Sequence, residues 1–136
     1  MSVEENKQLV RRFYAAIERG DFDALHDMVH KDFVFYSQID TPKPGVQGLV
    51  DSEKPSFDAF ESYIFPIDVL LAEGDKVAAY MRIEAKGYHT DLIGVPPRGQ
   101  NVRMSLMMLL TIKDGKIIEK RAHFDREDFR AQVTNN

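Results

Sequence analysis

The chain has 136 residues and a formal net charge of −4, a length that suits one domain with its own core. Its lysines and arginines are scattered rather than grouped, which argues against nucleic acid as a partner, and the absence of cysteine excludes disulfides and thiolate chemistry. No apolar run approaches the ~20 residues of a membrane span, and the N-terminus lacks an apolar signal core. We therefore expect one soluble, cytoplasmic domain over residues 1–136 that binds neither nucleic acid nor a membrane.

The first 30 residues predict two helices. Ser2 and Glu5 have the spacing of a capping box, and apolar residues then recur at helical spacing until Gly20, which suits a C-terminal cap. Tyr14 belongs to this apolar stripe, where its ring would enter the core or its hydroxyl a cavity. Asp21 can cap the second helix, whose apolar stripe is formed by Phe22, Leu25, Met28 and Val29.

Two histidines in this region have the spacing of metal ligands on a helix, because His26 and His30 lie four residues apart. The sequence marks out no carboxylate or third histidine that would complete such a site. Helix surfaces also carry pairs of this kind by chance. We therefore expect no metal ion.

The middle of the chain combines turn residues with aromatic residues. Residues 33–38 predict a short strand from their aromatic and β-branched content. Residues 39–54 predict a long loop, since they carry two prolines and two glycines; such a loop could cover a pocket mouth or be a disordered connector. Pro55 and Ser56 then open a third predicted helix, with Phe57, Phe60, Tyr63 and Ile64 as its apolar side.

The second half predicts strands. Segments 67–72 and 76–85 flank the turn Glu73-Gly74-Asp75, and 94–99, with two prolines between its glycines, predicts a loop. The apolar segment 102–112 ends at Asp114-Gly115, a strong hairpin signal, and a strand over 116–125 follows. A short helix is expected over 127–133. Helices first and an antiparallel meander after them indicate an α+β fold.

The last predicted strand has one charged face. Side chains alternate along a strand, so Ile117, Glu119, Arg121, His123 and Asp125 share that face. The opposite face has the composition of a packing surface, with Lys120 as its exception; its apolar members are Ile118, Ala122 and Phe124. We therefore expect the chemistry of the protein on the charged face.

The chain resembles the SnoaL-like polyketide cyclase family of the NTF2-like superfamily over nearly its whole length. Two stretches resemble the opening helix pair and the central hairpin of that family, namely 13–25 and 73–77. Gly87-Tyr88-His89-Thr90, followed by Gly94-Val95-Pro96-Pro97-Arg98-Gly99, is similar to the family's histidine segment and glycine-proline loop. Asp114-Gly115-Lys116-Ile117-Ile118-Glu119 resembles its late hairpin, and Asp125 and Gln132 fall where it has a late Asp and Gln.

This resemblance implies an α+β, NTF2-like (cystatin-like) cone in which a curved antiparallel sheet wraps around the long first helix and encloses an apolar pocket. Enzymes of the family close polyketide rings by intramolecular aldol condensation without a cofactor. The Asp at the position of Asp125 is their general acid/base. The superfamily also contains isomerases, epoxide hydrolases and non-catalytic binders, so the fold does not settle the function.

The chain departs from the family at two positions. Arg121 stands where the family has Trp, and Arg98 where it often has Thr. An arginine beside Asp125 would keep that carboxylate ionised, whereas a general acid/base near neutrality needs the opposite influence. Three interpretations follow: Arg121 points elsewhere, it binds an anionic group of the ligand, or Asp125 does not carry out cyclase chemistry. In a non-catalytic module, Arg121 and Asp125 would form a structural pair.

The candidate site therefore consists of six residues. Asp125 and His123 are the candidate catalytic residues, although Asp125 could instead cap the last helix. The candidate substrate-binding residues are Arg121, His89, Tyr14 and Tyr36.

Two classes of function are open at this stage. The first is a cofactor-independent cyclase, lyase or isomerase that acts on a small apolar or aromatic carbonyl compound. The second is a non-catalytic ligand-binding or dimerisation module, and an epoxide-hydrolase-like activity also fits because it needs only carboxylates and neighbouring donors. The apolar residues on the outer face of the sheet predict a homodimer.

Overall fold

The structure is a computed structural model that describes residues 2–135, and it has the α+β architecture expected from the sequence. The helices are α1 (Val3–Glu18), α2 (Gly45–Asp58) and α3 (Arg126–Asn135), with a 3-10 helix η1 (Phe22–Asp27) after α1. The strands are β1 (Val29–Tyr36), β2 (Pro42–Pro44), β3 (Phe60–Ile64), β4 (Ile67–Glu73), β5 (Lys76–Tyr88), β6 (Val102–Lys113) and β7 (Lys116–His123).

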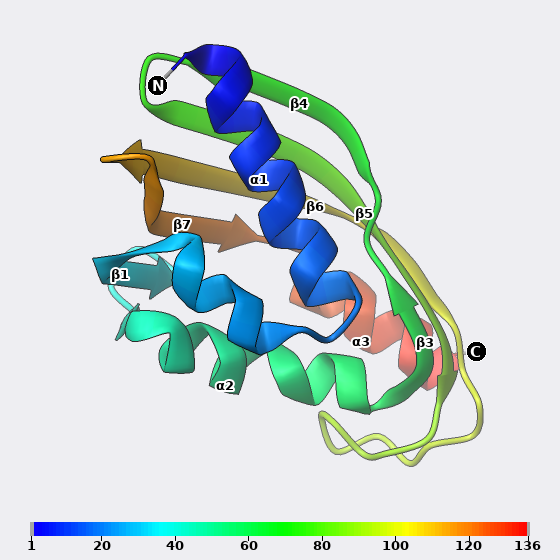
Figure 1. The fold of residues 1–136 in the computed structure, drawn as a ribbon. Coiled ribbons are helices and arrows are strands. Elements are labelled where there is room, and N and C mark those ends of the chain that lie inside the picture. Colours follow the sequence, from blue (N-terminus) through cyan, green and yellow to red (C-terminus); the bar gives the residue numbers. More distant parts are fainter. Residues whose placement is uncertain (1, 136) are drawn as a thin grey trace.

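The strands form one curved sheet around the first helix. Its strand order is β2-β1-β7-β6-β5-β3, and β4 also pairs with β5. Every pairing is antiparallel except that of β1 with β7, which is parallel. Figure 1 shows the sheet bending around α1, with α2 and α3 beside the end of the cone where α1 finishes. The predicted cone is thereby confirmed.

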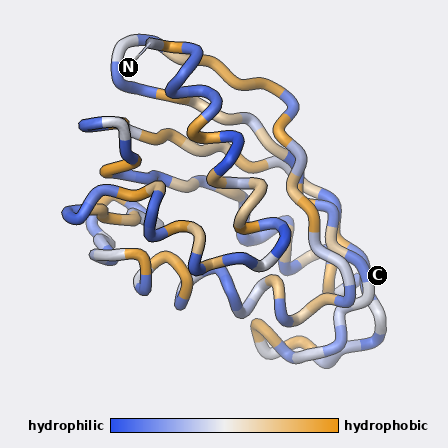
Figure 2. Tube along the Cα trace, viewed as in Figure 1, coloured by the Kyte–Doolittle hydropathy of each residue, from blue (hydrophilic) through white to orange (hydrophobic). Residues whose placement is uncertain are grey.

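The first helix has the boundaries and the buried face that the sequence predicts. Ser2 and Glu5 form the capping box, because each side chain accepts a hydrogen bond from the backbone N–H of the other at 3.1 Å. Figure 2 shows hydrophobic and hydrophilic residues alternating along α1 and the strands. The buried side of α1 includes Leu9, Val10, Phe13, Tyr14 and Ile17. These residues fill the interior of the cone.

The boundary after the first helix differs from the prediction. Asp21 does act as a cap, accepting from the Ala24 N–H at 3.3 Å, but it begins a 3-10 helix that ends at Asp27. Strand β1 then begins at Val29, earlier than the predicted residue 33. His26 and His30 consequently lie on two different elements rather than on one helix face.

The predicted loop over 39–54 is wrong, because these residues form β2 and most of α2. Pro44 has the extended backbone of an N-cap, and the helix after it buries Val46 and Leu49 against the core. At Gly48 a Cβ atom would lie 3.0 Å from the backbone carbonyl of Lys43, so glycine allows the helix and β2 to approach closely. Tertiary packing thus overrides the weak helix propensity of this segment.

The predicted third helix is also displaced. Pro55 lies inside α2 rather than at a helix start, and α2 ends at Asp58. The aromatic residues that follow belong to β3, where Phe60 pairs with Tyr88 of β5. The apolar spacing of Phe57, Phe60 and Tyr63 suits a helix, but the antiparallel pairing with β5 makes the last two part of a strand.

The long connection between β5 and β6 is held down by two buried polar side chains. The Tyr88 hydroxyl donates to the Val95 carbonyl at 2.9 Å and accepts from the Leu92 N–H at 2.7 Å. The Gln100 amide donates to the carbonyls of Pro96 and Val133, at 3.1 and 2.9 Å. These bonds attach the loop to itself and to α3.

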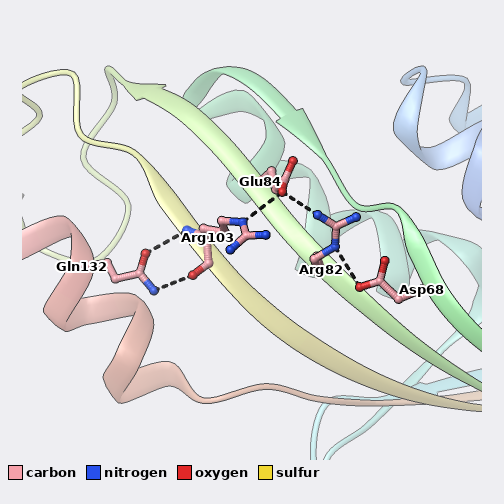
Figure 3. A network of polar contacts seen from close by, with 5 residues as sticks. All are labelled: Asp68, Arg82, Glu84, Arg103 and Gln132. Carbon is pink, nitrogen blue, oxygen red and sulfur yellow. Dashed lines mark hydrogen bonds and ion pairs between the residues drawn. The ribbon is translucent and has the colours of Figure 1, made fainter.

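A side chain of α3 completes the pairing at the edge of β6 (Figure 3). The pairing of β6 with β7 stops at Met107 and His123, and beyond it the Gln132 amide exchanges two hydrogen bonds with the backbone of Arg103. From there an ion-pair chain runs along the outer face through Arg103, Glu84, Arg82 and Asp68. Gln132 thereby fixes α3 against the sheet.

The outer face of the sheet carries exposed apolar side chains on three neighbouring strands. Val69 of β4, Tyr80 of β5 and Met107 of β6 are aligned by the strand register, and so are Leu71, Ala78 and Leu109. We call Val69, Leu71, Tyr80, Met107 and Leu109 the apolar strip; each is at least 40% exposed. Within residues 2–135, no helix is both long and apolar enough to cross a membrane.

Candidate functional site

A cavity of about 320 Å³ lies inside the cone, between the inner face of the sheet and the helices. Aromatic side chains form much of its wall: the Phe57 ring lies 4.5 Å from that of Tyr63 and 5.4 Å from that of Phe65, and Tyr14 contacts Phe65 edge-on. Its polar lining residues are Tyr14, Ser37, Lys43, Ser52, Glu53, Ser56, Tyr63, Lys120 and Arg126. The size and the apolar wall suit a small organic ligand.

The charged centre of this pocket is Lys120 of β7. Its side chain has no exposed surface, and its ammonium group forms an ion pair with the Glu53 carboxylate of α2. The ammonium nitrogen also lies 5.2 Å from the ring centres of Tyr14 and Phe35, within the range of cation–π attraction. A buried ammonium needs such compensation, since an unpaired one costs several kcal/mol.

An irregularity in β7 turns Lys120 towards the pocket. Ile112 pairs with Ile117 while Thr111 pairs with Glu119, so Ile118 is an extra residue that leaves Ile117 buried. Beyond it Lys120, Ala122 and Phe124 line the pocket. The predicted charged face does not line this pocket, because Glu119, Arg121 and His123 are not among the lining residues.

The hydroxyl of Tyr14 is buried in the pocket wall without a hydrogen-bond partner among the described residues. Burial raises the pKa of Tyr14 well above its ordinary value, and the nearby Glu53 carboxylate raises it further. The same two causes raise the pKa of Tyr63. Both phenols therefore stay neutral at physiological pH, and that of Tyr14 is available as a donor to a ligand.

The entrance of the pocket is more polar and more exposed. Phe124 and Arg126 are exposed residues that also line the pocket, and therefore they mark its mouth. Lys43 of β2 lines it as well and donates to the Ser52 hydroxyl at 2.8 Å. Ser52 in turn donates to the Gly48 carbonyl at 2.9 Å, which fixes this corner to α2.

Of the predicted catalytic pair, neither residue lines the pocket. Asp125 is exposed, and its carboxylate accepts from the Asp128 N–H at 3.1 Å, the geometry of a cap for α3. His123 is exposed at the end of β7. Their neighbours Phe124 and Arg126 do line the pocket, so the pair stands beside the mouth. The catalytic assignment of Asp125 and His123 stays a prediction.

Three of the four predicted substrate-binding residues lie elsewhere. The Arg121 guanidinium bonds to Glu119 at 3.0 and 3.2 Å and covers the Tyr36 ring at 4.0 Å, so the expected approach to Asp125 is not found. His89 is exposed, with its ring 2.8 Å from the Thr90 hydroxyl, while its neighbour Tyr88 points inward. Tyr14 is the predicted residue that reaches the pocket.

Sequence reasoning missed the two ionisable residues at the centre. Lys120 was visible as the charged exception on an otherwise apolar strand face, and a charge in such a position needs a buried partner. That signal could have identified it. Glu53 could not be found in the same way, because its segment reads as a loop.

At the centre of the pocket, the Lys120 and Tyr14 donors and the Glu53 acceptor stand together in apolar surroundings. Lys120 and Tyr14 can stabilise an oxygen atom that gains negative charge, and the Glu53 carboxylate can accept a proton. Within the described residues, no group of three or more His, Asp or Glu side chains could hold a metal ion.

A family model and solved structures both relate the chain to SnoaL-like polyketide cyclases. The model of the SnoaL-like polyketide cyclase family matches residues 7–133. AclR of Streptomyces galilaeus, a candidate hydroxylase, is 25% identical with a TM-score of 0.86, and the match covers 99% of both chains. A candidate SnoaL-like polyketide cyclase of Jannaschia sp. CCS1 shares the fold at 21% identity and a TM-score of 0.86, over 98% of this chain and 94% of that chain.

A third structure with this fold is that of TerC, which was crystallised with polyporic acid. Its identity is 18% and its TM-score 0.75, and the match covers 95% of this chain and 98% of that one. No curated protein sequence matches the chain.

Removing either member of the buried ion pair should destabilise the protein unequally. Glu53→Met leaves the fully buried ammonium of Lys120 unpaired, so we expect a loss of about 3–5 kcal/mol in the free energy of unfolding. Lys120→Met should cost less, because the Glu53 side chain retains 20% exposure to water. The double variant should be more stable than Glu53→Met, because two apolar side chains of similar volume need no compensation.

Urea unfolding measures these three values. Lys54→Met is the matched control, since its pair with Asp58 is exposed and should contribute less than about 1 kcal/mol. A double variant that is less stable than both single variants would contradict the account.

The raised pKa of Tyr14 and Tyr63 predicts a loss of stability at alkaline pH. A folded-state pKa above the unfolded value means that the unfolded chain loses the proton first, so this stability is complete below about pH 10 and falls as pH rises further. We expect a decline of about 1.4 kcal/mol per pH unit for each tyrosine above that pH. Tyr14→Phe should reduce this slope and leave stability at pH 7 unchanged or higher, because it removes an unpaired buried hydroxyl.

The measurement is urea unfolding at intervals from about pH 8 to pH 11. Tyr80→Phe, which removes a hydroxyl from the exposed apolar strip, is the control and should retain the wild-type slope. An unchanged slope in Tyr14→Phe would show that the buried phenol is not responsible.

Proposed function

We propose, since the chain belongs to the SnoaL-like polyketide cyclase family, that it is a cofactor-independent enzyme acting on a small apolar carbonyl compound. Its reaction would begin with removal of a proton from the carbon next to the carbonyl group, as in an aldol-type ring closure or an isomerisation. The one observation that carries this proposal is the group formed in the aromatic pocket by the buried Lys120 and Tyr14 with the half-buried Glu53.

The chemistry of these side chains supports a proton transfer. When a base takes the α-proton, the electron pair of that C–H bond moves into a carbon–carbon double bond and the carbonyl oxygen becomes negative. Lys120 and the neutral Tyr14 hydroxyl are donors for that oxygen, and preorganised donors of this kind are worth roughly 10²–10³ in rate each. Neither donor has to leave a water shell, because both are buried before the ligand arrives.

Position is the ground for choosing Glu53 as the base, since its Lys120 partner has the same kind of influence that an arginine beside Asp125 would have. The Glu53 carboxylate lines the pocket and touches the Lys120 ammonium, so a carbonyl oxygen bound there has its α-carbon near the carboxylate. The alternative base is Asp125, assisted by His123, which the resemblance to the family suggests. Asp125 is exposed and engaged in capping α3, which makes it the weaker candidate.

One structural neighbour carries a small organic ligand. TerC was crystallised with polyporic acid, which supports a small organic ligand for this fold. An aromatic ligand also suits the walls of this pocket, where Phe57, Tyr63 and Phe65 pack around the empty volume.

The proposal is testable without the natural substrate. We expect the protein to accelerate the exchange of the α-protons of 2-tetralone, an apolar bicyclic ketone, in D₂O, followed by NMR. Glu53→Gln should lower this rate by about 10²-fold or more, because the base is lost. Lys120→Met should lower it by a similar factor, while Asp125→Asn should retain most of it.

Circular dichroism of each variant separates loss of catalysis from loss of folding. If Asp125→Asn abolishes the exchange and Glu53→Gln retains it, the base is Asp125 rather than Glu53. Exchange by the wild-type protein at the rate of buffer alone would contradict the proposed function.

A homodimer through the outer face of the sheet is the second part of the proposal. The apolar strip is the observation that favours it, since monomeric proteins rarely leave such a row of large side chains in water. Sedimentation equilibrium should give twice the chain mass for the wild type and the single mass for Leu109→Glu. Val3→Glu, which changes an exposed apolar residue of α1, should remain dimeric. A monomeric wild type would contradict this part alone.

A further inference from the structure

The pocket has the opposite charge to the rest of the chain. The chain carries a net charge of −4, but the ionisable residues that line the cavity are Lys43, Lys120 and Arg126 against one carboxylate, that of Glu53. Three positive charges minus one negative charge leave a surplus of two. Walls of low dielectric strengthen the potential of such a surplus inside a cleft.

Among the lining residues, the charges without a lining counter-charge are those of Lys43 and Arg126; Asp125, the cap of α3, stands beside Arg126 without lining the pocket. Glu53 pairs with Lys120, so these two charges balance each other inside the cone. Lys43 bonds to a neutral hydroxyl, that of Ser52. Arg126 is exposed, and no carboxylate in the described part of the chain forms an ion pair with it.

The backbone of Arg126 is held in a defined place. Arg126 is the first residue of α3, and α3 is fixed by the Gln132 bonds to Arg103 and by the Gln100 bond to Val133. Phe129, one turn further along α3, contributes its ring to the pocket wall and packs against Phe60. The guanidinium therefore belongs to a helix whose next turn already forms part of the cavity.

We propose that the ligand of this pocket is an aromatic compound with an anionic group such as a carboxylate, bound with that group at Arg126. Its apolar body lies among Phe57, Tyr63 and Phe65, and Lys43 adds positive potential at the entrance. The guanidinium can grip a carboxylate through two parallel hydrogen bonds, and this fixes which end of the ligand points inward. The inference rests on the proposed function only in taking the cavity as the ligand site.

The unpartnered Tyr14 hydroxyl supports a ligand with a second polar end. It is buried at the inner side of the pocket, where it needs an acceptor, while Arg126 stands at the outer side. An aromatic keto acid satisfies both, because its carbonyl oxygen can accept from Tyr14 and its carboxylate can pair with Arg126. A purely apolar ketone can accept a hydrogen bond from Tyr14, but it leaves the positive charge of Arg126 without a counter-charge.

A matched pair of probes tests the inference by isothermal titration calorimetry. 2-Naphthoate carries the carboxylate, and 2-naphthamide has the same ring and nearly the same shape without the charge. We expect naphthoate to bind at least about tenfold more tightly, and Arg126→Gln to remove about that factor for naphthoate and none for naphthamide. Added salt should weaken the binding of naphthoate selectively.

Arg130→Gln is the control, because Arg130 is an exposed residue of the same helix that does not line the pocket, and both affinities should be unchanged. Equal affinity for the two probes, failure of naphthoate to bind, or an unchanged affinity in Arg126→Gln would overturn the inference. Its failure is distinguishable from that of the proposed function. If the protein exchanges the protons of 2-tetralone but prefers naphthamide, only the inference of an anionic ligand is overturned. If the protein binds naphthoate at Arg126 but does not exchange the protons of 2-tetralone, only the proposed catalytic function is overturned.

Discussion

The ammonium group of Lys120 lies inside the cone without exposed surface, and Glu53 supplies the carboxylate that balances it. An unpaired charge in this position costs several kcal/mol in the free energy of folding, so the fold has to bring a carboxylate next to Lys120. Helix α2 brings Glu53 to the inner face of the sheet, and α1 and β1 surround the ammonium with the rings of Phe13, Tyr14 and Phe35. The packing of α2, which the glycines and prolines of its sequence do not favour, is thereby linked to one buried charge.

A single extra residue in β7 decides which chemistry enters the pocket. Ile118 is a bulge, and the apolar Ile117 before it stays in the core. After the bulge, the even-numbered residues of the strand face inward. Lys120 therefore faces the cavity, while Arg121 lies on the outer face against Glu119 and Tyr36. Alternation along 118–125 already places Lys120 with Ala122 and Phe124 on one face; what it cannot anticipate is that Ile117, before the bulge, is buried as well.

Local signals in the sequence were sufficient for much of the fold. The capping box at Ser2, the hairpin at Asp114-Gly115 and the period-two strands each depend on neighbouring residues, and the structure has all of them. The errors occur where distant contacts decide. Residues 45–58 become a helix through burial of Val46 and Leu49, and residues 60–64 become a strand through pairing with β5. The site includes residues from both wrongly predicted segments, because Glu53 lies in the first and Tyr63 in the second.

Stability alone gives no reason for the polar groups of the pocket. A buried ion pair is often no better for stability than two apolar side chains of equal volume, and an unpaired buried hydroxyl is a cost. Yet the Lys120 and Glu53 pair and the Tyr14 hydroxyl stand in the wall of one cavity. Groups that are unfavourable without a ligand become favourable when a ligand oxygen accepts from them, since the desolvation has already occurred. A pocket of this kind binds an oxygen atom with growing negative charge better than it binds a neutral one, and that difference is what catalysis of proton removal requires.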